Sequence, residues 1–331
     1  MMKLSTMLKV DSTLDAQWRS RIAENILEQW EHDPGSAHFF RASNNFVYIF
    51  SNGGKHCFLR FTESTEQTRA AIEAEMALLN FLDSRGMPVA TPIASKNGRY
   101  VETVETDLGT FHAVVFEQLQ GQEREIDELN PEQFERWGAT LGRLHALMHL
   151  YQDPEVSARR TWKDHLSLIR NYVPQDESRV QAESDYLSSF LAALPVTATN
   201  YGLIHGDFEL DNLRWQDEVI AMFDFDDCSS SWYITDVAFA LRDLFETGVS
   251  LHNPSFQAFI RGYSKHNPLD EELISHMPLW MRWVNLITYA KLTRAMDLAP
   301  DHDYPEWCAS LLLKLENKRQ SYKASLLSMP L

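Results

Sequence analysis

The hydrophobic periodicity of the chain changes near residue 120, and this change limits the folds that it can adopt. Residues 39–116 contain short β-type runs around one helical stretch, whereas residues 131–327 carry mostly helical spacing. A chain of 331 residues is long for a single core and suits two packed lobes. We therefore expect an α+β protein with a first lobe over residues 1–120 and a second over residues 121–331.

The first lobe is predicted to be small and β-rich, with one long helix. Apolar residues at helical spacing predict a leading amphipathic helix over residues 12–31. Two β-type runs flank Ser51-Asn52-Gly53-Gly54 and predict a hairpin over residues 45–61. The remaining predicted elements are a helix over residues 66–85 and strands over residues 98–104 and 110–116.

Helical periodicity dominates the second lobe, with one interruption. Residues 201–227 contain two short β-type runs around several acids and one Asn. A polar stretch before Asn130-Pro131 has the composition of an interlobe linker. The predicted helices cover residues 131–149, 177–194, 236–247, 254–266, 277–297 and 305–327.

Charge and cysteine content exclude several classes of function. The 47 acidic and 30 basic residues give a formal charge of −17, which argues against a nucleic-acid partner. The same charge is compatible with a cationic substrate, although acidity more often serves solubility. Cys57, Cys228 and Cys308 have no metal-ligand spacing, so we expect a reducing compartment, the cytoplasm. No apolar run suits a signal peptide or a membrane span.

The interrupting segment contains residues suited to phosphoryl transfer. This chemistry needs an acid near the attacking hydroxyl, oxygen ligands for Mg²⁺ and a fixed geometry. Asp207 is predicted to orient a substrate hydroxyl and accept its proton. Asn212 and Asp224 are predicted to hold Mg²⁺ against the β- and γ-phosphates. For any one of these residues alone, a turn-capping role would be the better explanation.

His205 precedes these residues and is expected to organise the loop. Its imidazole can hydrogen-bond to the backbone near Asp224 and so fix the loop conformation. Proton transfer by His205 itself is the less favoured alternative.

At this point the chain resembles a known family. His205-Gly206-Asp207 through Asn212 has the form HxDxxxxN and resembles the catalytic loop of the aminoglycoside phosphotransferase and choline kinase superfamily. Phe223-Asp224-Phe225-Asp226 resembles its metal-binding motif. The resemblance covers nearly everything from about Ser36 to the last helices. It implies a bilobal protein-kinase-like fold, with ATP and Mg²⁺ as cofactors, and makes Asp226 a candidate second-metal ligand.

Two further segments extend the resemblance. Asp236-Val237-Ala238 resembles a family segment whose Asp braces the catalytic loop, although a plain helix N-cap would explain Asp236 equally well. Leu141-Gly142-Arg143-Leu144-His145 resembles the family's helix ending in Leu-His. A single His on an amphipathic helix is more often a satisfied core residue, so His145 is not expected to be catalytic.

The resemblance also implies a nucleotide site in the first lobe. Asn44-Asn45-Phe46-Val47-Tyr48 resembles the family's nucleotide loop, which places Asn45 near the phosphates. The linker residues Glu117 and Leu119 stand where such kinases hold adenine by backbone hydrogen bonds.

Arg60 stands where the family usually has the Lys that contacts the α- and β-phosphates. An Arg keeps the positive charge of the Lys but binds phosphate through two N–H groups of its planar guanidinium. The alternative interpretation is that Arg60 is an exposed residue on an edge strand without a role in nucleotide binding. The acid that pairs with it should lie on the following helix. Glu75 fits the family position better than Glu73, but the helix register leaves both open.

The predicted function is transfer of the γ-phosphate of ATP to a hydroxyl of a small molecule. The family resemblance implies an aminoglycoside, choline or ethanolamine, homoserine or sugar-like acceptor. A Ser/Thr protein kinase is the first alternative, but only eleven residues separate Asp224 from Asp236, too few for a peptide-binding activation segment. An inactive nucleotide-binding relative is the second. The intact Asp207, Asn212 and Asp224 argue against it, whereas Arg60 leaves room for it.

Overall fold

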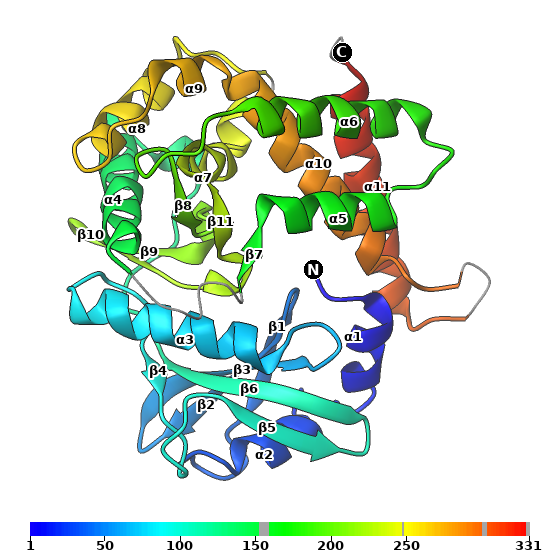
Figure 1. Cartoon of the computed structure of the whole chain (residues 1–331). Helices are drawn as coiled ribbons and strands as arrows, with labels where there is room; N and C mark the ends of the chain where they lie inside the picture. Colours follow the sequence, from blue (N-terminus) through cyan, green and yellow to red (C-terminus); the bar gives the residue numbers. More distant parts are fainter. Residues whose placement is uncertain (152–158, 247, 300–302, 329–331) are drawn as a thin grey trace. The chain divides into compact units, whose positions relative to one another are not determined.

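The computed structural model describes residues 1–151, 159–246, 248–299 and 303–328, and the chain forms two compact units (Figure 1). An antiparallel sheet in the first unit and a mainly helical second unit confirm the predicted α+β class. The first unit comprises Met1–Asn80, Ala90–Gln118 and Lys291–Gln320, and the second comprises Phe81–Val89, Leu119–Ala290 and Ser321–Leu331. Two segments therefore depart from the predicted division at residue 120: Phe81–Val89 and Lys291–Gln320.

The first unit is built on one sheet. Its strands are β1 (His38–Ala42), β2 (Phe46–Asn52), β3 (Lys55–Glu63), β4 (Pro92–Ile93), β5 (Glu102–Thr106) and β6 (Gly109–Glu117). The order is β1-β2-β3-β6-β4, with β5 on β6, and every pairing is antiparallel. The predicted hairpin is confirmed by the β2–β3 register, and α3 (Arg69–Ser84) lies alongside β3 and β6 (Figure 1).

One face of this sheet forms an aromatic core. Alternate residues of β2, Phe46, Tyr48 and Phe50, are buried because successive side chains of a strand point to opposite faces. Phe61 of β3 stacks on Phe46 and Tyr48 at centroid distances of 5.2 and 5.6 Å. Such pairs add about 0.5–1.5 kcal/mol each beyond the burial of their area.

The single helix predicted over residues 12–31 is wrong. The structure instead has α1 (Leu4–Asp11) and α2 (Arg21–Leu27), with a bridge between Leu14 and Ser20 and a positive φ of 60° at Trp18. Ser20 starts the second helix because its hydroxyl accepts the Ala23 N–H at 3.3 Å. The apolar spacing survives this reversal, which explains the wrong prediction.

Helix α1 is held in the first unit by Glu66, which follows β3. The Glu66 carboxylate accepts hydrogen bonds from the Lys3 N–H at 3.1 Å and the Thr6 hydroxyl at 3.0 Å. It also pairs with Arg294 near the end of α10 (Met277–Ala295), and its side chain is 6% exposed. One buried carboxylate therefore ties together three segments that are far apart in the sequence.

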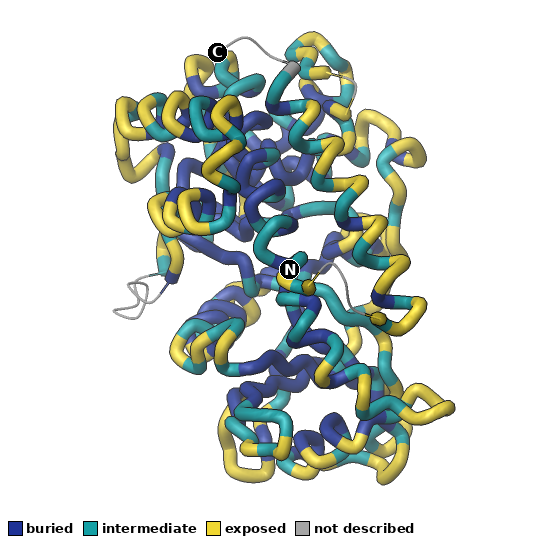
Figure 2. The backbone as a smooth tube through the Cα atoms, turned by 90° about the vertical axis from the view of Figure 1, so that its right-hand side faces the viewer, coloured by how far each residue is buried: buried dark blue, intermediate teal, exposed yellow. Residues whose placement is uncertain are grey.

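The second unit is mainly helical, and its buried residues lie inside while the outer turns are exposed (Figure 2). Its helices are α4 (Pro131–His149), α5 (Trp162–Tyr172), α6 (Ser178–Ala193), α7 (Tyr233–Ala240), α8 (Pro254–Ser264), α9 (Glu271–Ser275), most of α10 and the end of α11 (Glu306–Ser328). Its strands are β7 (Arg160–Thr161), β8 (Tyr201–Ile204), β9 (Leu213–Gln216), β10 (Val219–Met222) and β11 (Ser229–Trp232). The β9–β10 hairpin was predicted, whereas α5 and the β7-β11-β8 sheet were not.

Helices α4 and α8 pack backbone against backbone. A Cβ atom added at Gly138 would lie 2.0 Å from the Phe259 carbonyl oxygen, and one at Gly142 would lie 2.3 Å from the Tyr263 carbonyl oxygen. These glycines permit the close approach, which brings side chains from the two helices into direct contact. Across the part of the chain that the structure describes, no helix is long and apolar enough to cross a bilayer.

Candidate functional site

The loop between β8 and β9 contains the predicted catalytic residues. Asn212, at the end of a short 3₁₀ turn (Leu210–Asn212), is 2% exposed. Its Nδ2 donates to the Asp207 carboxylate oxygen Oδ2 and to the Asp207 carbonyl oxygen, both at 2.9 Å. These bonds use the amide nitrogen, so they orient the Asn212 amide and leave its oxygen as the group suited to a cation.

The buried Asp236 carboxylate holds the start of this loop. Its Oδ2 accepts the His205 N–H at 2.6 Å, and its Oδ1 accepts the Gly206 N–H at 2.7 Å. Gly206 has a φ of 82°, and a Cβ there would lie 2.3 Å from the Asp227 carbonyl oxygen. Asp236 lies within the first turn of α7, so the N-cap interpretation is wrong and the brace interpretation fits its contacts.

His145 supports Asp236 from α4. Its Nε2 lies 2.9 Å from Asp236 Oδ2, and its Nδ1 lies 2.6 Å from the Tyr263 hydroxyl, which also accepts from Asn267 Nδ2 at 2.9 Å. His145 is a satisfied buried residue, as predicted, but its partner Asp236 holds the start of the loop that contains the candidate catalytic residues. A single sequence gives no signal for this link, because the three residues are far apart along the chain.

The His205 imidazole joins the loop to the next motif. Its Nε2 lies 3.1 Å from the Phe223 carbonyl oxygen, and because a carbonyl only accepts, we assign the proton to Nε2. The ring packs against Phe225 at a centroid distance of 4.3 Å and is completely buried. The hydrogen bond to Phe223 is the contact that the sequence predicted for His205, with the backbone beside Asp224.

The predicted metal ligands lie close to this contact. The Phe223 N–H donates to the Asn212 carbonyl oxygen at 3.1 Å, which brings the strand end and the loop together. Asp224 has left-handed φ and ψ of 67° and 58° and precedes a 3₁₀ turn (Phe225–Asp227) that contains Asp226. Left-handed backbone is costly for a residue with a Cβ and is concentrated at functional sites.

The donor set fits Mg²⁺. Carboxylate oxygens of Asp224 and Asp226 and the amide oxygen of Asn212 are hard ligands, and Mg²⁺ typically takes one or two protein carboxylates. Among the residues that the structure describes, no three Asp, Glu, His or Cys side chains converge on one point. A cation here would therefore complete its coordination with water or phosphate oxygens.

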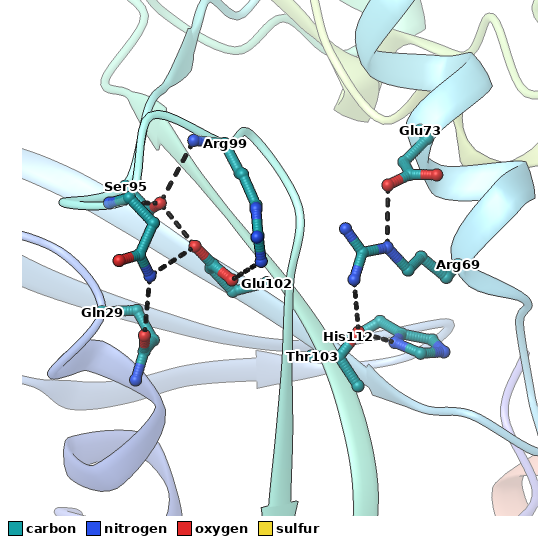
Figure 3. Close-up of polar contacts among 9 residues, drawn as sticks. Gln29, Arg69, Glu73, Ser95, Arg99, Glu102, Thr103 and His112 are labelled. Atoms are coloured by element: carbon teal, nitrogen blue, oxygen red, sulfur yellow. Dashed lines mark hydrogen bonds and ion pairs between the residues drawn. The ribbon is translucent and has the colours of Figure 1, made fainter.

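Arg60 in the first unit pairs with Glu75 rather than Glu73. Its two terminal nitrogens, Nη1 and Nη2, donate to the two Glu75 oxygens at 2.8 and 2.5 Å, and both side chains are buried. Glu73 instead accepts from Arg69 Nε at 2.7 Å, near Thr103 and His112 (Figure 3). The helix register is thereby fixed, and Arg60 is not the exposed edge-strand residue of the alternative.

The sheet face that carries Arg60 also carries aromatic rings. Cross-strand pairing places Phe58 opposite Phe116, and the Arg60 guanidinium carbon lies 5.1 Å from the centre of the Phe116 ring. Phe40 is 51% exposed, and its ring packs edge-on against the Phe58 ring with the two ring centroids 5.5 Å apart. The sequence analysis did not single out these rings. The sequence could have indicated Phe58, because it lies two residues from Arg60 on the same strand and therefore points to the same face of the sheet.

The remaining predicted nucleotide residues occupy three positions. Asn45 is buried in the turn between β1 and β2. Glu117 ends β6, and its N–H donates to the Thr91 carbonyl oxygen at 3.1 Å. Leu119 is the first residue after the β6 segment that belongs to the second unit.

Glu209, in the loop between β8 and β9, forms an ion pair with Arg242, which follows α7. Arg242 Nη2 lies 2.5 Å from Glu209 Oε1 and 2.7 Å from Oε2. Burial raises the pKa of Glu209, Arg242 acts in the opposite direction, and Asp207 adds to the rise. The sequence analysis did not identify this pair.

Comparison with known proteins gives one family and several relatives. The model of the phosphotransferase enzyme family matches residues 38–269. Amicoumacin kinase of Bacillus subtilis (strain 168) is 28% identical over 270 residues, which cover 78% of this chain and 80% of that protein.

Solved structures agree with the fold. An amicoumacin kinase in complex with AMP-PNP and Ca²⁺ superposes with a TM-score of 0.79 and 25% identity, covering 98% of this chain and 96% of that one. A microcompartment-associated aminopropanol kinase gives a TM-score of 0.69 and 22% identity, covering 93% and 97%. At that identity the second likeness shows the fold alone.

Proposed function

The chain belongs to the phosphotransferase enzyme family, and we propose that it transfers the γ-phosphate of ATP to a hydroxyl of a small molecule. The observation that carries this proposal is the contact of Asn212 with Asp207, tied through Phe223 to Asp224. It groups a candidate base and candidate metal ligands in one unit, as phosphoryl transfer requires.

Each residue of this group has a proposed role. Asp207 orients the acceptor hydroxyl and takes its proton as the oxygen bonds to the γ-phosphorus and the bond to the bridging β–γ oxygen breaks, releasing ADP. Asn212, Asp224 and Asp226 would hold Mg²⁺, which would neutralise phosphate charge. His205 fixes the loop and, being buried between ring and carbonyl contacts, is not a base in this proposal.

The nucleotide contacts are proposed for the first unit and the linker. Arg60, oriented by Glu75, would contact the α- and β-phosphates, and the turn at Asn45 would lie over them. The Glu117 carbonyl and the Leu119 N–H would hold the base. The Glu117 N–H is already engaged by Thr91, which leaves its carbonyl for this role.

A cationic small acceptor is proposed over a protein substrate. The formal charge of −17 is compatible with a cation, and the curated relatives include an amicoumacin kinase. The residues between Asp224 and Asp236 are occupied by a 3₁₀ turn, by β11 and by the start of α7. That compact path supports a small acceptor rather than a peptide. The cytoplasm remains the proposed compartment, supported by three cysteines that form no disulfide, all of them in described segments.

Phosphate transfer from labelled ATP tests the proposal directly. The acceptor panel contains an aminoglycoside, choline, ethanolamine, aminopropanol, homoserine, a sugar and a generic protein, each with and without Mg²⁺. Metal-dependent labelling of one or more small acceptors supports the proposal. Labelling of the protein alone would favour a protein kinase, and nucleotide binding without any transfer would favour an inactive relative.

A further inference from the structure

The Glu209–Arg242 pair lies beside the proposed catalytic residue. Glu209 follows Asp207 by two residues, and its N–H donates to the Asp207 carbonyl oxygen at 2.9 Å. Arg242 follows α7, the helix whose Asp236 braces the same loop. The Glu209 and Arg242 side chains are 16% and 17% exposed, so neither is completely buried.

The hydrogen bonding of this pair is incomplete. Within the described residues, the side-chain hydrogen bonds and ion pairs of Arg242 all involve Nη2, which contacts both carboxylate oxygens of Glu209. Glu209 Oε1 is enclosed and has Nη2 at 2.5 Å, yet no well-directed hydrogen bond reaches it from the described residues. A guanidinium has five N–H donors and a carboxylate about four acceptor positions, so both groups keep capacity for a ligand.

The charge around the pair is negative. Asp207, Asp211 and Asp243 all act electrostatically on Glu209, and Arg242 is acted on by three carboxylates, those of Glu209, Asp207 and Asp243, and by the Tyr322 hydroxyl. An ammonium group is therefore favoured here over an anion. Two residues of chain span at most about 7 Å, which limits the distance between a hydroxyl at Asp207 and a cation at Glu209.

We propose that Glu209 and Arg242 select the acceptor. Glu209 accepts a hydrogen bond from an ammonium group of the acceptor, while Arg242 donates to one of its oxygens and holds the Glu209 carboxylate in place. The acceptor class is then an amino alcohol, or an amino sugar, whose amine lies within about 7 Å of the reacting hydroxyl. This inference rests on the proposed function and adds the residues that read the amine.

The test compares each amine acceptor with its N-acetyl derivative, which keeps the hydroxyl and loses the charge. Aminopropanol, homoserine and an aminoglycoside are used in both forms with wild type, Glu209→Gln and Glu209→Asp. The matched control is Glu135→Gln, which alters an ion pair with Lys265 in the same unit. Circular dichroism melting reports whether each variant folds.

We expect wild type to prefer the amine forms in kcat/KM by about 10–100-fold, the size of one charge-assisted hydrogen bond. Glu209→Gln should remove most of that preference by raising KM for the amine forms, with KM for ATP unchanged. Glu209→Asp should keep part of the preference, and Glu135→Gln should keep all of it.

Two results would overturn the inference. One is an active wild type with no preference for the amine forms. The other is a Glu209→Gln variant whose kcat falls equally for both forms at constant KM, since the pair would then only position Asp207. A different result would contradict the proposed function itself, namely that wild type transfers phosphate to none of the small acceptors. In that case the inference about Glu209 and Arg242 would fail as well.

Discussion

His145 and Asp236 form a completely buried pair in which the imidazole Nε2 lies 2.9 Å from the carboxylate Oδ2. Because a carboxylate only accepts, we assign the proton to Nε2, and Nδ1 then accepts from the Tyr263 hydroxyl. Burial raises the pKa of Tyr263 well above its ordinary value, so the hydroxyl keeps its proton. A continuous hydrogen-bond path thus runs from Asn267 to the backbone amides of His205 and Gly206.

Removing the Tyr263 hydroxyl should weaken this path without emptying the core. In Tyr263→Phe the ring remains, but His145 Nδ1 loses its buried donor, which typically costs about 1–3 kcal/mol in the free energy of unfolding. We also expect a lower kcat with an unchanged KM for ATP. Urea denaturation and steady-state kinetics measure both quantities. Tyr186→Phe, at a 41% exposed position, is the control, and equal stability of the two variants would contradict the prediction.

Substitution of Asp207 should mainly lower kcat, whereas substitution of Asp224 should mainly weaken ATP binding. Asp207→Ala should lower kcat by about 10²–10⁴-fold with ATP affinity nearly unchanged, because its role is realised in the transition state. Asp224→Ala should instead weaken Mg²⁺-dependent ATP binding by about tenfold or more. Equilibrium titration with ATP and Mg²⁺ separates the two, with exposed Asp185→Ala as the control. Equal loss of ATP affinity in both variants would rule out this division.

Arg60 should not tolerate Lys fully, although Lys is the usual family residue. The Glu75 carboxylate is oriented by a two-point contact that an ammonium cannot reproduce. We expect Arg60→Lys to raise KM for ATP by about tenfold, equivalent to about 1.4 kcal/mol. The control is Glu73→Gln, because its exposed pair with Arg69 contributes little. An unchanged KM in Arg60→Lys would show that the fork is dispensable.

Glu66 should make the stability of the first unit depend on acid pH. Burial alone would raise the pKa of Glu66, but Arg294, the Lys3 N–H and Thr6 together lower it below its ordinary 4.5. A carboxylate with a lowered folded pKa stabilises the fold above its unfolded pKa, and that stabilisation is lost as pH falls through the folded value. Glu66→Gln should therefore be less stable than wild type near neutral pH, with the difference shrinking below about pH 4.5. Thermal melts across pH measure it, and a difference that grows with acid would contradict the sign.

The sequence predicted the parts of this protein that depend on local pattern. The β2–β3 hairpin and helix α4 follow from alternation and from the Asn130-Pro131 start signal, and both are present. The candidate catalytic segment could be proposed from the sequence because its acids and Asn lie close together along the chain. Its internal contact, Asn212 to Asp207, spans only five residues.

Features that depend on distant partners were missed or misread. Asp236 was compatible with an N-cap until its contacts with the His205 and Gly206 amides were seen, about thirty residues upstream. The leading segment kept helical spacing through a reversal at Trp18, which apolar periodicity does not record. The Glu209–Arg242 pair joins positions 33 residues apart and has no local signature.

The glycine contacts between α4 and α8 have a consequence for how this enzyme can change. With backbone against backbone at Gly138 and Gly142, a single added methyl group would push the helices apart, so neither position can vary freely. Because α4 carries His145 and α8 carries Tyr263, such a change would separate two residues that support Asp236 and the proposed catalytic loop. Laboratory evolution toward new acceptors should therefore accumulate substitutions outside the α4–α8 interface, while Gly138 and Gly142 stay unchanged.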